Sequence, residues 1–91
     1  MDKTVARAIL RKHLDSYRKR SVSELASLVD SPATAEVVAV SGERYQIEVQ
    51  VFWADSEKRT LRVLGSIDDG GWRTLLPLCE DFLVDSQEQR A

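Results

Sequence analysis

The spacing of apolar residues changes from a helical to a strand period near residue 35, and this change constrains the fold more than any other feature. Over residues 3–19, apolar side chains recur three and four positions apart, as on one face of an α-helix. Apolar and polar residues then alternate, most clearly from Tyr45 to Trp53. The sequence therefore predicts an α+β fold, with two N-terminal helices packed on one face of an antiparallel meander of about four strands.

The two expected helices differ in length and in the signals that bound them. The first has an apolar arc made of Ala6, Ile9, Leu10, His13, Leu14 and Tyr17. The second, a short helix, is expected to begin at Ser21, because Ser21 and Glu24 fit a capping box. It must end before Pro32, since the residue preceding a proline disfavours helical backbone.

A turn signal at Ser41–Arg44 predicts the pairing of the first two strands. A two-residue hairpin here would place Gly42 at a positive φ, where glycine is favoured. The first strand would then cover residues 36–41, with Val38 opposite Ile47. This register would turn Val37 and Ala39 away from the helices.

A second turn signal, Asp68–Gly71, predicts the pairing of the last two strands. The third strand is expected over Thr60–Asp68, and a two-residue turn would set Ile67 opposite Trp72. Pro77 cannot donate to a strand ladder, so the fourth strand is expected to end there or to lie at an edge of the sheet. Residues 78–84 would add a last turn or short strand.

Length and composition favour a single small domain. The chain has 91 residues, of which 43% are hydrophobic and 31% charged, so residues 1–91 are expected to form one domain. Its ordered core would cover about residues 3–84, followed by a polar tail over 85–91. The apolar runs are too short for a membrane span and no signal-peptide core follows Met1, so a cytoplasmic location is expected. Cys79 is the only cysteine, which excludes an internal disulfide.

The sheet face turned away from the helices is expected to be mixed rather than purely polar. The candidate interface has three apolar residues and three charged residues at its rim: Phe52, Leu64, Leu75, Glu48, Arg62 and Arg73. An apolar patch with a polar rim is typical of an interaction site, and the simplest partner is a second copy related by a two-fold axis. Two alternatives stay open: residues 78–84 fold back over this face, or its apolar residues are ordinary surface.

The layout resembles a known superfamily. The helical start, the long strand Tyr45–Trp53 and the late Asp69–Arg73 stretch are similar to NTF2-like (cystatin-like) α+β domains. The resemblance implies a curved sheet and a function among isomerases, dehydratases or non-catalytic dimerising modules; the fold alone does not choose between them. Members usually have a further helix between the early and late strands. Residues 54–59 leave no room for it, so the pocket of the family is expected to be shallow or missing.

Candidates for chemistry are few. His13 and Tyr17, on the arc of the first helix, could line a ligand pocket between that helix and the sheet, although a single histidine there is more often a packed core residue. Asp68 and Asp69 fit turn chemistry better than a metal site. We expect no catalytic residue, no metal and no cofactor.

The first twenty residues carry seven basic and two acidic residues, whereas the whole chain has a net charge of −2. Arg7, Arg11 and Arg18 lie opposite the apolar arc and could contact phosphates. They could equally face the acidic body of the domain or solvent, and the overall acidity makes nucleic acid the less favoured partner. The leading interpretation is therefore a non-enzymatic, homodimeric interaction module. A small-molecule binder or enzyme is the second, and a nucleic-acid contact the third.

Overall fold

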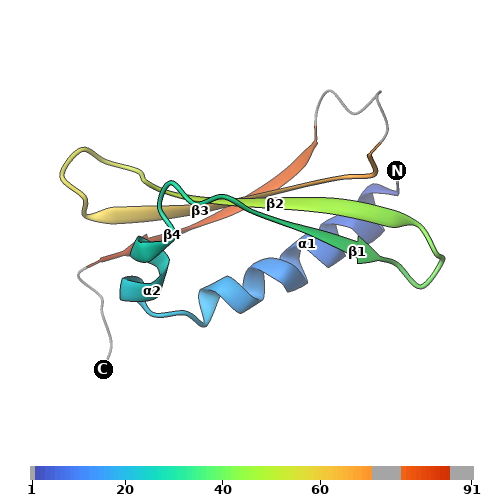
Figure 1. The fold of residues 1–91 in the computed structure, drawn as a ribbon, viewed down its shortest axis with the longest axis horizontal. Coiled ribbons are helices and arrows are strands. Elements are labelled where there is room, and N and C mark those ends of the chain that lie inside the picture. Colours follow the sequence, from blue (N-terminus) through green and yellow to red (C-terminus); the bar gives the residue numbers. More distant parts are fainter. Residues whose placement is uncertain (1, 71–76, 87–91) are drawn as a thin grey trace.

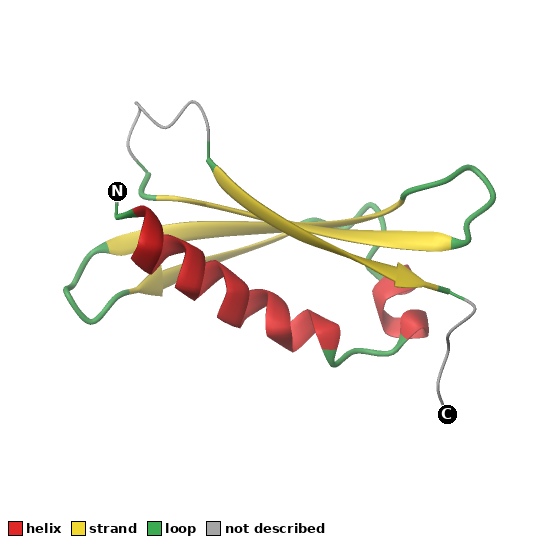
Figure 2. Ribbon diagram, turned by 180° about the vertical axis from the view of Figure 1, so that it is seen from behind, coloured by secondary structure: helices red, strands yellow, loops and turns green. Residues whose placement is uncertain are grey.

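The computed structural model describes residues 2–70 and 77–86. Its elements, in chain order, are α1 (Lys3–Arg18), α2 (Val22–Ser27), β1 (Ala33–Val38), β2 (Arg44–Trp53), β3 (Thr60–Asp68) and β4 (Leu78–Asp85). The four strands form one sheet in the order β1-β2-β3-β4, with every neighbouring pair antiparallel. Both helices lie on the same side of the sheet (Figures 1 and 2). The predicted α+β fold is confirmed.

The helices begin where local capping satisfies their free N–H groups. The Asp2 carboxylate accepts the N–H groups of Thr4 and Val5, at 3.0 and 3.2 Å, and so caps α1. The Ser21 hydroxyl accepts the N–H of Glu24 at 3.1 Å, as the capping box predicts. The buried residues of α1 all belong to the predicted arc: Ala6, Leu10, Leu14 and Tyr17.

The core lies between α1 and the middle of the sheet. Alternate residues of β2 and β3 face the helix and are buried: Tyr45, Ile47, Val49, Val51, Leu61, Val63 and Ile67. Gly65 shares this face, and its missing side chain lets Leu10 and Leu14 approach β3 closely. α1 is consequently seated over β3 and β4 rather than over β1.

The predicted pairing of β1 with β2 is wrong by three residues. Ala35, not Val38, lies opposite Ile47. The cause is a three-residue turn: Gly42 N–H donates to Ala39 O and Ala39 N–H donates to Glu43 O, both at 2.8 Å, and Gly42 has a φ of 89°. An odd shift exchanges the two faces of a strand, so Val37 and Ala39 face the helix side, not the outer face.

The predicted partner of β3 is also wrong, although the short strand expected over residues 78–84 is present as β4. β4 begins after Pro77 instead of ending at it, and Ile67 lies opposite Leu78 rather than Trp72. A proline immediately before a strand removes no ladder bond, so this position suits it equally well. Because residues 78–85 form a strand of the sheet, they do not fold back over its outer face. The expected strand residues 71–76 lie outside the described part of the chain.

Candidate functional site

The inner face of the sheet is covered unevenly by α1. Because α1 packs on β3 and β4, a groove of about 840 Å³ is left between α1 and the edge strand β1. Its walls are mainly apolar. They include Val5, Ile9 and His13 from α1, and Val37, Val38 and Val40 from β1 and the turn that follows it.

Exposed large apolar side chains gather at this groove and at its β1 border. Four such residues are exposed in the described part of the chain: Val5 at 39%, Val38 at 58%, Leu83 at 57% and Val40, which is fully exposed. Val5 and Val40 lie in the groove wall, and Val38 borders the groove from β1, where its side chain is on the outer face opposite Arg44. An apolar surface that is concentrated in this way indicates an interaction site.

The groove borders a free strand edge. β1 is the last strand on its side of the described sheet, so alternate N–H and C=O groups of its backbone point outward. Free edges of this kind can add a further strand, and many proteins protect theirs with charged side chains or proline. Here the protection consists of Pro32, immediately before the strand, and Glu36 within it.

The structure brings the two predicted pocket residues together, but only one of them lines the groove. The rings of His13 and Tyr17 lie 5.8 Å apart. His13 is half-buried in the groove wall, whereas Tyr17 is buried in the core. The Arg20 guanidinium lies 4.4 Å above the Tyr17 ring. Among the described residues, no group of three His, Cys, Asp or Glu side chains could hold a metal ion.

The three anion-contact candidates are held by neighbouring side chains of the chain itself. Arg11 Nε lies 2.8 Å and Arg7 Nε 3.6 Å from Oε1 of Glu80, which projects from β4 toward the helix. Arg18 lies 4.3 Å above the ring of Phe82 and pairs with Asp15 at 3.6 Å. Two of the three arginines are therefore paired with one carboxylate of the sheet, and the third with a carboxylate of α1.

The outer sheet face carries part of the predicted interface. Phe52 and Leu64 are half-buried there, and Leu83 lies on the same face. Arg62 Nε lies 3.0 Å from Oδ2 of Asp81, a residue of the neighbouring strand. Glu48, the acidic rim candidate, accepts a hydrogen bond from the Gln50 amide at 3.0 Å. Arg73 and Leu75 lie outside the described residues.

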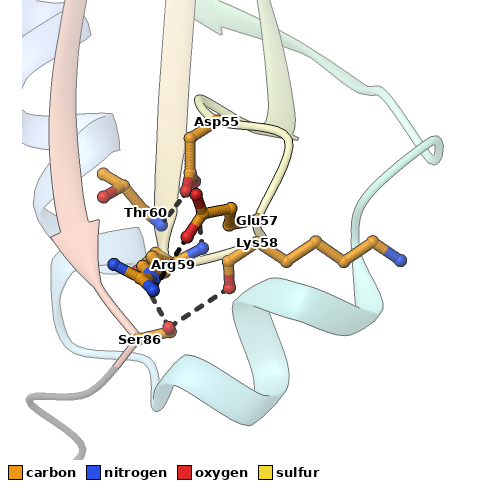
Figure 3. A network of polar contacts seen from close by, with 6 residues as sticks. All are labelled: Asp55, Glu57, Lys58, Arg59, Thr60 and Ser86. Atoms are coloured by element: carbon orange, nitrogen blue, oxygen red, sulfur yellow. Dashed lines mark hydrogen bonds and ion pairs between the residues drawn. The ribbon is translucent and has the colours of Figure 1, made fainter.

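A polar network holds the β2–β3 loop against the end of β4 (Figure 3). The Asp55 carboxylate accepts the N–H groups of Arg59 and Thr60, each at 2.9 Å. These bonds, the one from Thr60 foremost, hold the pKa of Asp55 below its usual value of 3.8. The Ser86 hydroxyl donates to Arg59 O at 2.8 Å. Each partner in this network serves to close the loop, which makes it a structural feature rather than a binding site.

The sequence reasoning missed the exposed valines of the groove. A strand with one buried face needs an apolar residue only at alternate positions, but residues 37–40 are apolar in succession. That excess is the signal that could have identified Val38 and Val40. Nothing in the sequence marks Val5, because its exposure depends on where α1 lies across the sheet.

Comparison of the chain with protein-family models, with curated proteins and with solved structures gives no match. The resemblance to NTF2-like domains thus stays a prediction. No helix in the described part of the chain is both long and apolar enough to span a membrane.

Proposed function

We propose that this chain is a non-enzymatic interaction module that works as a homodimer. The observation that carries the proposal is a mainly apolar groove, with the exposed Val5 and Val40 in its wall, beside the free edge of β1. The groove favours a surface different from the one expected from the sequence, namely the α1–β1 side rather than the outer sheet face.

The choice between these two surfaces follows from their side chains. The groove contains one fixed charge, that of Lys12, among mostly apolar walls. On the outer face, Phe52 and Leu64 are already half-buried by their neighbours, and polar or charged side chains lie opposite them: Arg62 opposite Phe52, and Gln50 and Asp81 opposite Leu64. Antiparallel sheets commonly expose one mixed or polar face to water, so the outer face needs no partner.

Sedimentation equilibrium on the wild-type chain and on two matched variants tests the proposal. Val40→Glu alters the fully exposed groove residue, and Leu83→Glu makes the same change of charge on the outer face, at a residue that is 57% exposed. Because both side chains are exposed, both variants should fold normally, which circular dichroism checks. We expect a wild-type dimer, a weakened dimer for Val40→Glu and no change for Leu83→Glu.

Two results would contradict this picture in different ways. A wild-type chain that stays monomeric at millimolar concentration would remove the homodimer altogether. A dimer that is dissociated by Leu83→Glu and not by Val40→Glu would move the contact to the outer sheet face.

A further inference from the structure

The free edge of β1 can pair with a second copy of the same strand. Ala39 N–H donates to Glu43 O, so the backbone groups of Ala39 point toward β2. Along an antiparallel ladder, residues that point toward the neighbouring strand alternate with residues whose N–H and C=O groups point away from it. Thr34, Glu36 and Val38 therefore direct their backbone groups to the open side of the sheet. Two copies related by a two-fold axis satisfy each other's groups and leave no edge exposed at the contact.

The residues of β1 restrict where this axis can pass. Antiparallel pairing keeps residues of one face opposite each other, so the axis must pass through a residue position. An axis at Glu36 would set two carboxylates directly opposite, which destabilises a strand pair. An axis at Ala35 would set the Val38 carbonyl opposite Pro32, which has no N–H to donate. An axis at Val37 avoids both faults.

Charge and burial agree with an axis at Val37. Each Glu36 would lie opposite Val38 of the second copy, and Val38 is paired across its own sheet with Arg44. In the single chain, Glu36 and Arg44 form only a loose, exposed ion pair at 3.8 Å. In the dimer each carboxylate gains a second guanidinium, and the two Val37 side chains meet on the inner face, where the grooves of the two copies become continuous.

From these relationships we propose that two copies join by antiparallel pairing of their β1 strands about an axis at Val37. The two four-stranded sheets become one sheet of eight strands, and the two apolar grooves join across the contact on its inner face. This inference rests on the proposed homodimer and adds the identity of its contact.

Disulfide trapping tests the position of the axis. In the full chain with Cys79→Ser, which removes the native exposed thiol, one cysteine is introduced at a time. Val37→Cys should cross-link under mild oxidation, because the Cα atoms of such a non-hydrogen-bonded pair lie about 4.5 Å apart, within reach of a disulfide. Ala35→Cys is the matched control. Its two copies would lie roughly 14 Å apart along the strands and should stay reduced.

A proline at the free edge gives an independent test. Glu36→Pro removes an N–H that points away from β2, so the fold should be kept while the edge loses a donor in each copy. Two lost hydrogen bonds raise the dimer Kd by roughly 30-fold. Circular dichroism checks that the variant is folded; if it is not, the cysteine pair alone decides.

The outcomes separate this inference from the proposed homodimer. Cross-linking at position 37 and not at 35 supports the edge pairing. A wild-type dimer whose Val37→Cys variant does not cross-link, or whose folded Glu36→Pro variant keeps the wild-type Kd, overturns the edge pairing and leaves the homodimer standing. A monomeric wild type overturns both.

Discussion

Gly65 of β3 lies so close to Leu10 of α1 that a Cβ atom at position 65 would be 2.9 Å from Leu10 Cδ1. The same atom would be 2.9 Å from Leu14 Cδ2, and both leucines are buried, with at most 1% exposed. Neither methyl group can move aside without disturbing the core. Gly65→Ala should therefore lower the free energy of unfolding by about 1–3 kcal/mol, as measured by urea denaturation.

The control for this variant is Ser66→Ala, one residue along the same strand but on the outer face. It should change the stability by less than about 0.5 kcal/mol. Gly65→Ala combined with Leu14→Ala should cost less than the sum of the two single changes, because the smaller residue makes room for the new methyl group. A Gly65→Ala protein as stable as wild type would mean that α1 lies farther from β3.

The ion pairs of Glu80 should contribute measurably to stability. Its side chain is only 28% exposed and lies 2.8 Å from Arg11. We expect Glu80→Gln to destabilise the fold by ~0.5–1 kcal/mol at low salt and by less in 1 M salt, where charges are screened. Glu57→Gln is the control, since its pair with Arg59 has the same length but is 62% and 66% exposed. Equal effects of the two variants would show that burial of Glu80 adds nothing.

The same two variants test whether the basic side of α1 is available to anions. Glu80 engages Arg7 and Arg11, so the wild-type chain should be released from heparin at low salt. Glu80→Gln frees both guanidinium groups and should need more salt for release. Glu57→Gln makes the identical change of net charge away from α1 and should elute close to wild type. Strong, salt-dependent retention of the wild type would instead favour a nucleic-acid contact.

Asp55 should make the fold sensitive to acid. Its pKa in the folded chain lies below 3.8, because the N–H groups of Thr60 and Arg59 stabilise the carboxylate. The resulting stability is complete above pH 3.8 and is lost as the pH falls through the lower pKa of the folded state. Urea midpoints measured between pH 7 and pH 2 should show this loss for the wild type and a smaller loss for Asp55→Asn.

Ser86→Ala separates titration from simple loss of the loop network. It removes the hydroxyl that donates to Arg59 O at 2.8 Å but no titratable group. Its destabilisation relative to wild type should therefore be the same at every pH. If the Asp55→Asn difference from wild type is equally independent of pH, the lowered pKa does not contribute to stability.

Much of the fold was predictable from the sequence because local signals and burial agree there. The α1 arc has one period throughout, and the alternation in β2 and β3 leaves one possible buried face for each strand. Ser21 caps α2 as expected, because a hydroxyl three residues before Glu24 is placed to accept the N–H of Glu24 at the start of a helix.

The register of β1 was not predictable because two turns fit the same residues. Gly42 supplies a positive φ to a two-residue or a three-residue turn, and the successive apolar residues 37–40 allow either face to be buried. The start of β4 was ambiguous for a similar reason, since proline is tolerated at either end of a strand. The groove depends on this register of β1 and on the place of β4 beside β3. It also depends on Gly65, which seats α1 over β3 and leaves β1 uncovered.

Gly42 offers a test of the turn that sets the β1 register. Its φ is 89°, but a Cβ there would meet no atom within 4 Å, so any cost of a side chain comes from the backbone alone. Gly42→Ala should destabilise the fold by about 1 kcal/mol, and Gly42→Asn by less, because asparagine tolerates left-handed backbone better. At Gly65 the order should be reversed, since there the obstacle is volume. Urea denaturation of the four variants distinguishes the two causes, and Gly42→Asn costing as much as Gly42→Ala would contradict the left-handed turn.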